Sequence, residues 1–239
     1  MSKPPKIDRK ELRHPDQFQK KGQDFLEVIL ANKRHLIFLL AGILVVVIGA
    51  YGYSLWDDHR TETAWNVYHT ASKASDKEKW EAYKKVYVEH KGTRAALFAS
   101  TSLADYYFEE ARKSVLKDSK STPPETAQAI EWYSKALEFN GLLPQEKQLL
   151  SINLGNANEM AGKYDESLKL YQSAQEGGSQ IKGYALLNVA RVYELKNDKA
   201  KAIETYEKVA ADFINTEYAK MAKNNARRLK NPSLNSQNL

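Results

Sequence analysis

The sequence KKVYVEHKGTRAALFA at residues 84–99 returns in altered form as EKVAADFINTEYAKMA at residues 207–222, which lies 123 positions further along the chain. Each stretch has the character of a helix end, a short break and the start of a helix with small residues on one face. Thr93 and Thr216 occupy the same place in the break, and alanines follow each of them at matched spacing. A chain that carries the same junction twice is predicted to be built from repeated units.

A wider pattern surrounds these junctions. It consists of a small residue, a second small residue twelve positions later, an aromatic residue four beyond that and a small apolar residue three further on. Two complete copies lie 35 positions apart, one at Gly155, Ser167, Tyr171 and Ala174 and the other at Ala190, Ala202, Tyr206 and Val209. Small residues allow the two helices of a hairpin to approach, and the aromatic ring fills the gap toward the next unit. The pattern predicts helical hairpins that bury their apolar faces against like neighbours.

A further copy of the pattern is interrupted. Ala104 and Tyr107 carry its first half, and AIEWYSKAL at residues 129–137 carries the second half and matches AIETYEKVA at residues 202–210. The extra residues lie around 111–124, where a charged segment that ends in two prolines predicts a loop insertion.

Composition and local signals place the expected helices. Glycine (11) and proline (7) are scarce in 239 residues, which favours helices over sheets. Asn140-Gly141 should stop one helix, Pro144 should begin the next, and Asp165 and Asp198 should cap the second helices of two hairpins. We predict an all-α protein with helices near residues 57–74, 77–90, 93–116, 124–139, 144–161, 164–176, 180–195, 198–213 and 216–230, the last of which caps the stack.

Residues 36–56, LIFLLAGILVVVIGAYGYSLW, carry no charge and predict a single transmembrane helix. At ~1.5 Å per residue the segment spans about 30 Å, the thickness of the hydrocarbon core of a bilayer. Lysine and arginine are more frequent before this segment than after it, so the positive-inside rule places residues 1–35 in the cytoplasm and residues 57–239 outside. A buried globular helix rarely has 21 uncharged residues in a row. A cleaved signal peptide is disfavoured because a cleavage site after Ala50 would need a small residue at position 48, where Ile48 stands.

The tail before this segment holds most of the excess positive charge. Residues 1–35 carry nine basic and five acidic residues, whereas residues 57–239 carry 27 and 25, so no basic stripe for nucleic acid is expected. Apolar residues recur at helical spacing from residue 18 to residue 30. They predict a tail with an amphipathic helix, which either lies on the membrane surface or lengthens the anchor. Residues 231–239 are expected to be a disordered tail.

The residues that usually carry chemistry form no recognisable constellation. The chain has no cysteine, and its five histidines show none of the spacings of metal ligands. No glycine-rich phosphate loop and no nucleophile motif occurs. We therefore predict no catalytic residue, no cofactor, no cofactor-binding residue and no metal site, and a protein that is not an enzyme.

Repeats of this kind offer a concave surface lined by the first helix of each hairpin. The register predicts a protein-binding groove that mixes apolar side chains with single charges of both signs, formed by Thr101, Asp105, Phe108, Ile152, Asn156, Glu159, Leu187, Arg191 and Glu194. An ordinary solvated helix surface is the alternative. Because stacked repeats expose apolar ends, a homodimer is also expected.

The repeated pattern resembles the tetratricopeptide repeat, a helix–turn–helix unit of about 34 residues. Leu154-Gly155 and Ala190 with Tyr193 match its first element, and Ala202 with Tyr206 matches its second. The early tryptophan and the closing proline of the repeat are missing here. The resemblance implies a tetratricopeptide-like solenoid over residues 57–230.

The layout of tail, anchor and hairpins is similar to that of the YfgM-like ancillary subunits of the bacterial Sec translocon. Local similarity is strongest in GTRAALFASTSLADYYFEE, residues 92–110, which YKKVYVEHK precedes. The resemblance implies a single-pass protein of the bacterial inner membrane with a periplasmic repeat domain. It also implies association with the SecYEG channel and with periplasmic chaperones or secreted clients. An adapter subunit of another cell-envelope assembly machine, for division, outer-membrane assembly or secretion, is the alternative.

Overall fold

The computed structural model describes residues 17–117, 122–176 and 179–231, which form helices and turns and contain no strand. The all-α prediction is therefore confirmed for this part of the chain. The residues fall into two units, Met1–His59 and Arg60–Leu239. The predictions for residues 1–16 and 232–239 lie outside the described residues.

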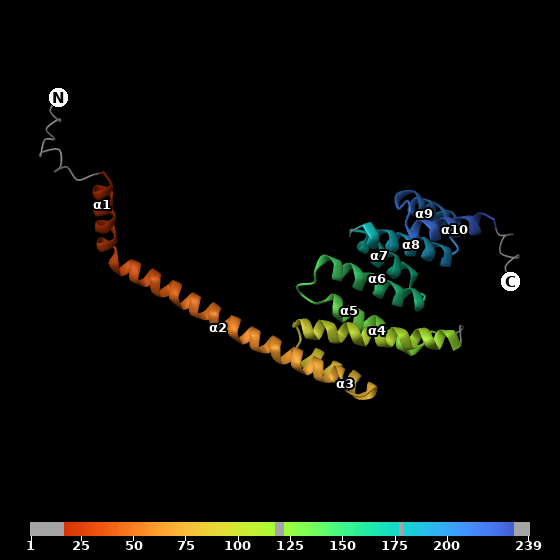
Figure 1. Ribbon diagram of the computed structural model, residues 1–239, viewed down its shortest axis with the longest axis horizontal. Coiled ribbons are helices and arrows are strands. Elements are labelled where there is room, and N and C mark those ends of the chain that lie inside the picture. Colours follow the sequence, from red (N-terminus) through yellow and green to blue (C-terminus); the bar gives the residue numbers. More distant parts are fainter. Residues whose placement is uncertain (1–16, 118–121, 177–178, 232–239) are drawn as a thin grey trace, which may run out of the picture. The chain divides into compact units, whose positions relative to one another are not determined.

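The first unit contains α1 (Gln17–Ala31) and the apolar part of α2 (Lys33–Ser72) (Figure 1). Asn32 alone separates the two helices, and its side-chain amide donates to the Val28 carbonyl at 3.0 Å. The uncharged segment 36–56 lies wholly within α2, and its apolar side chains are exposed. Among the described helices, α2 is the one long and apolar enough to cross a membrane.

The same helix continues into the second unit, so the helix predicted to begin at residue 57 is instead the end of α2. The helices that follow agree with the predicted bounds to within two residues. They are α3 (Asp76–Glu89), α4 (Arg94–Lys117), α5 (Pro124–Leu137), α6 (Pro144–Met160), α7 (Tyr164–Ser173) with the short η2 (Ala174–Glu176), α8 (Ser179–Leu195), α9 (Lys199–Asp212) and α10 (Glu217–Lys230). Each helix from α3 onward packs on the next, and α6, α8 and α10 also contact one another in turn. This packing confirms the predicted stack of hairpins.

The duplicated junction has the same local structure in both places. The Thr93 hydroxyl accepts a hydrogen bond from the Ala96 N–H at 3.2 Å at the start of α4. The Thr216 hydroxyl accepts one from the Ala219 N–H, also at 3.2 Å, at the start of α10. Each threonine thus satisfies one of the free N–H groups at a helix start.

The residue before each threonine has a left-handed backbone. Gly92 has φ +85° and Asn215 has φ +65°, a region that glycine and asparagine tolerate better than other residues. The threonine hydroxyls also donate back to the carbonyls of His90 and Phe213, at 2.8 Å and 2.6 Å. The recurrence of threonine at these two places therefore reflects one repeated capping turn between hairpins.

Loss of this cap should cost stability. We expect Thr216→Ala to lower the free energy of unfolding by about 1 kcal/mol, because the cap bond is lost and nothing replaces it. Thr205→Ala, in the middle of α9, is the matched control and should change stability by less than about 0.5 kcal/mol. Urea unfolding followed by circular dichroism measures both values. Equal effects of the two substitutions would contradict the capping role.

The turn within a hairpin recurs at the 35-residue spacing. Gly162 (φ +72°) follows α6 and Asn197 (φ +60°) follows α8. Their N–H groups donate to the carbonyls of Glu159 and Glu194, both at 2.9 Å. These bonds satisfy carbonyls that a helix end leaves free. The hairpins therefore share their turn geometry as well as their spacing.

The two predicted aspartate caps have different outcomes. Asp198 is the N-cap of α9, and its side chain accepts from the Lys201 N–H at 3.2 Å. The prediction for Asp165 was wrong, because Lys163 occupies the N-cap of α7 and Asp165 lies in its first turn. There the Asp165 carboxylate pairs with Lys196, so it links α7 to the end of α8.

Part of the predicted loop insertion is helical. The first helix of this hairpin, α4, has 24 residues, whereas α6 and α8 have 17 each. Helix α4 extends through Lys117, and the chain is described again from residue 122. The extra residues thus lengthen α4, and residues 118–121 lie outside the described part.

Three clusters of buried residues form the core of the stack. One joins the end of α2 to α6, and another joins α8, α9 and α10. Between them, a cluster of residues from α6, α7, η2 and α8 surrounds the fully buried ring of Tyr171. The core is thus shared between neighbouring hairpins, as expected for a solenoid.

Candidate functional site

Three buried tyrosines from the second helices of the hairpins reach the first helices. The Tyr133 hydroxyl donates to Asp105 Oδ1 on α4 at 2.6 Å. A buried tyrosine ring usually places its hydroxyl against an acceptor, because an unpaired hydroxyl is costly. The Tyr171 hydroxyl, from α7, donates to Asn156 Oδ1 on α6 at 2.6 Å and lies 3.1 Å from Glu159 Oε2.

The same arrangement recurs at the end of the stack. The Tyr206 hydroxyl lies 3.3 Å from Glu194 Oε2 on α8. Its ring, like that of Tyr171, is almost completely buried. The tyrosines of the sequence pattern therefore both fill the core and fix polar groups on the first helices.

Two arginines join these polar groups from one hairpin to the next. Arg191 on α8 donates to Glu159 on α6 at 2.9 Å. Arg228 on α10 donates to Glu194 on α8 at 2.6 Å. Hydrogen bonds between charged partners are stronger than those between neutral ones. The result is a polar row along α4, α6, α8 and α10, formed by Asp105, Asn156, Glu159, Arg191, Glu194 and Arg228.

Burial, with a contribution from Glu194, raises the pKa of Tyr206 to about 12. A phenol whose pKa is raised in the folded protein stabilises it below about pH 10, the ordinary value, and loses that contribution as the pH rises toward 12. We expect the free energy of unfolding to fall between about pH 10 and pH 12. The Tyr206→Phe variant, which lacks the phenol, should show a smaller fall over the same range. Urea unfolding of both proteins at intervals of pH measures the difference. Parallel curves for the two proteins would contradict this role of Tyr206.

Most of the sequence-predicted groove residues are brought together. Five of them form the polar row with Arg228: Asp105, Asn156, Glu159, Arg191 and Glu194. Phe108 is half-buried, with its ring centroid 6.5 Å from that of Tyr133. Thr101 lines a groove between α4 and α6.

Ile152 and Leu187 require a correction. Their side chains are only 3% and 6% exposed and lie in the core clusters on either side of α8. Residues of α7 and α8 cover Ile152, and residues of α9 and α10 cover Leu187, so neither residue faces a groove.

The groove between α4 and α6 has a volume of about 240 Å³ and a mostly apolar lining. Its walls are formed by Leu97, Phe98, Thr101, Glu146, Leu149, Leu150 and Asn153. Phe98 and Leu149 are 44% and 53% exposed, so both side chains offer apolar surface to the groove. At one edge, Arg94 donates to both oxygens of Glu146, at 2.9 and 2.5 Å.

Sequence reasoning missed Phe98 and Leu149, although the register contains a signal for them. Both stand six residues before the small residue of their hairpin, Ala104 or Gly155. Tyr184 has the same place before Ala190 and is also exposed. Exposed apolar side chains at this register position therefore recur in three successive first helices.

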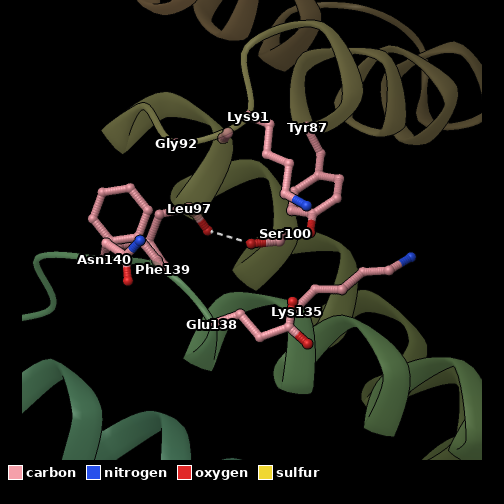
Figure 2. A pocket seen from close by; sticks show the side chains of 10 residues that line it. Tyr87, Lys91, Gly92, Leu97, Ser100, Lys135, Glu138, Phe139 and Asn140 are labelled. Atoms are coloured by element: carbon pink, nitrogen blue, oxygen red, sulfur yellow. Dashed lines mark hydrogen bonds between the residues drawn. The ribbon is translucent and has the colours of Figure 1, made fainter.

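A second pocket, of about 270 Å³, lies at the end of α3, the start of α4 and the end of α5 (Figure 2). The Ser100 hydroxyl in it donates to the Leu97 carbonyl at 2.9 Å. The amine of Lys135 points away from the other labelled side chains and lies 4.0 Å from the centroid of the Trp132 ring. Both groups are thus engaged within the fold. In the described residues, no group of three or more histidines, aspartates or glutamates could hold a metal ion.

No model of a known protein family matches the chain, and neither does any curated protein sequence. Among solved structures, nearly identical TPR-like repeats from a kinesin light chain-like protein of Podosopora anserina are similar to it. They share 14% identity over 75% of this chain and 87% of that chain, with a TM-score of 0.49. A variant of the same repeats gives 13% identity over 74% and 96%, with a TM-score of 0.43. The assignment of a hairpin stack therefore rests on the helix contacts of this structure and not on these similarities.

Proposed function

We propose that the chain is a membrane-anchored protein that binds other proteins along the first helices of its hairpins and that it is not an enzyme. The groove between α4 and α6 carries this proposal, because it exposes Phe98 and Leu149 on a well-packed face. Binding energy in protein interfaces concentrates where large apolar side chains are covered by the partner. The polar row beside the groove would supply the directional contacts of such an interface.

Anchoring is proposed from the apolar part of α2. Its 36–56 segment has no charge, and all its side chains are exposed, which would be costly in water. A bilayer removes this cost, since the segment matches the thickness of its hydrocarbon core. The excess of lysine and arginine before the segment supports a cytoplasmic amino terminus.

The partner we propose is the Sec translocon of the bacterial inner membrane, with periplasmic chaperones or secreted chains at the groove. The resemblance of residues 83–110 and of the layout to the YfgM-like subunits supports this partner. The alternative, an adapter of another cell-envelope machine, shares the fold and the groove and differs only in its partners.

Site-specific photocrosslinking of the full chain in living membranes tests the proposal. We expect a probe at Ile43 to capture channel subunits and a probe at Leu149 to capture chaperones or secreted chains. A probe at Val88, an exposed residue on α3, is the matched control and should capture neither. Crosslinks from Leu149 and Ile43 to one other envelope complex would move the assignment to the adapter. The absence of any product specific to Leu149 would contradict protein binding at the groove.

The orientation can be tested separately because the chain has no cysteine of its own. Nothing lies within 4 Å of a Cβ added at Gly22, and the Ile214 side chain is exposed, so a new thiol should be tolerated at both. A membrane-impermeant maleimide should label the Ile214→Cys variant in spheroplasts. It should label Gly22→Cys only after the membrane is permeabilised. The reverse result would invert the proposed topology.

A further inference from the structure

The polar row contains one carboxylate that lacks a basic partner. Glu159 on α6 accepts from Arg191 on α8, and Glu194 on α8 accepts from Arg228 on α10. Asp105 instead accepts from the Tyr133 hydroxyl, and among the described residues no lysine or arginine forms an ion pair with it.

The register places Asp105 differently from the two paired glutamates. Asp105, Asn156 and Arg191 each follow the small residue of their hairpin by one position, whereas Glu159 and Glu194 follow it by four. Like Asn156, Asp105 accepts from the tyrosine of its own hairpin. No ion pair links it to α6 among the described residues, and the Asp105 residue is partly exposed.

This carboxylate stands next to the groove between α4 and α6. Thr101 lines the groove, and Asp105 lies four residues later on the same face of α4, about 6 Å along the helix axis. The acidic residue of the groove itself, Glu146, is already engaged by Arg94 and by the Leu143 N–H. Asp105 is therefore the carboxylate that a segment in the groove could still pair with.

The groove is small for a whole ligand. Its volume of about 240 Å³ is below the range of about 300–1,000 Å³ that is usual for small-molecule sites. Its apolar lining suits one large side chain of a protein segment. In an extended chain, side chains two residues apart lie on one side and about 6.6 Å apart, close to the separation of Thr101 from Asp105.

We infer that the groove takes an extended protein segment with one large apolar side chain and, two residues away, a lysine or arginine that pairs with Asp105. The inference rests on the proposed protein-binding function and names the chemistry of the segment. Although the Asp105 residue is partly exposed, the protein around its carboxylate displaces water and so raises the pKa of Asp105. The hydrogen bond from Tyr133 opposes this rise, and nearby Glu109 adds to it. The surroundings therefore disfavour the charged form of the Asp105 carboxylate, and a nearby cation would stabilise that form.

Peptide binding to the full chain in lipid nanodiscs tests the inference. The probes are fluorescent decapeptides of glycine and serine with one phenylalanine and, two residues later, lysine, glutamine or glutamate. We expect the lysine peptide to bind about fivefold more tightly than the glutamine peptide, and the glutamate peptide to bind most weakly. Asp105→Asn should remove these differences, so that the three peptides bind with equal affinity. The new amide oxygen can still accept from Tyr133, so the melting temperature should not fall.

Two matched controls separate the contributions. Asp212→Asn, at an exposed carboxylate at the end of α9, should keep the preference for lysine. Leu149→Ala should weaken all three peptides equally, whereas Leu116→Ala, at an exposed leucine on α4, should weaken none. Equal binding of the three peptides, or a lysine preference that survives Asp105→Asn, would overturn the inference and leave the protein-binding proposal standing. Failure of all phenylalanine peptides to bind better than a peptide without phenylalanine would overturn both.

Discussion

Tyr171→Ala should lower the free energy of unfolding by about 3–5 kcal/mol, because it removes a large aromatic side chain from the core and leaves a cavity. The Tyr171 ring is fully buried in the central cluster, which joins α6 and α7 to α8. Solenoids stay cooperative only while the contact between neighbouring units is strong. We therefore also expect urea unfolding to split into two transitions, which circular dichroism and tryptophan fluorescence would resolve.

Tyr171→Phe separates the ring from the hydroxyl. It should cost about 1 kcal/mol, because the ring still fills the core while Asn156 loses its hydrogen bond. Tyr184→Ala, at an exposed tyrosine on α8, is the matched control and should cost less than Tyr171→Ala. If Tyr171→Ala and Tyr184→Ala cost the same, the central cluster would not be the link between the two halves of the stack.

Gly155→Ala should destabilise the protein by about 1–3 kcal/mol, although alanine is the better helix former by about 1 kcal/mol. A Cβ added at Gly155 would lie 2.6 Å from Cε1 and 3.0 Å from Cδ1 of Tyr171, well inside van der Waals contact. The Ser167 hydroxyl also donates to the Gly155 carbonyl at 2.9 Å, so α6 and α7 cannot easily move apart. Thermal and urea unfolding measure the change.

The sign of this effect separates packing from helix propensity. At the equivalent position of the next hairpin, Ala190→Gly should also destabilise the protein, because the buried Cβ is lost there. A double-mutant cycle of Gly155→Ala with Tyr171→Leu should show favourable coupling, since leucine has no ring at the site of the clash. A stabilising Gly155→Ala would show that the two helices can separate at no cost.

Part of the candidate site could be predicted from the sequence. The spacing of 35 residues placed Asn156 with Arg191 and Glu159 with Glu194 on equivalent faces, and all four lie in the polar row. The same spacing could have found Phe98 and Leu149. It could not show that Glu159 and Glu194 meet arginines of the following hairpin while Asp105 meets Tyr133, because that depends on which side chains of neighbouring helices meet.

The helices and their turns follow from local signals in the sequence, because each signal acts over a few residues. Pro144 begins α6, Thr216 caps α10, and the left-handed turns fall at Gly162 and Asn197. Which residues of a helix face are covered depends instead on how neighbouring helices pack. Ile152 and Leu149 are three residues apart on α6, yet the contact of α6 with α8 buries the first while the second stays exposed in the groove. Burial is a property of the space between neighbouring helices, and residues distant in the sequence set the width of that space.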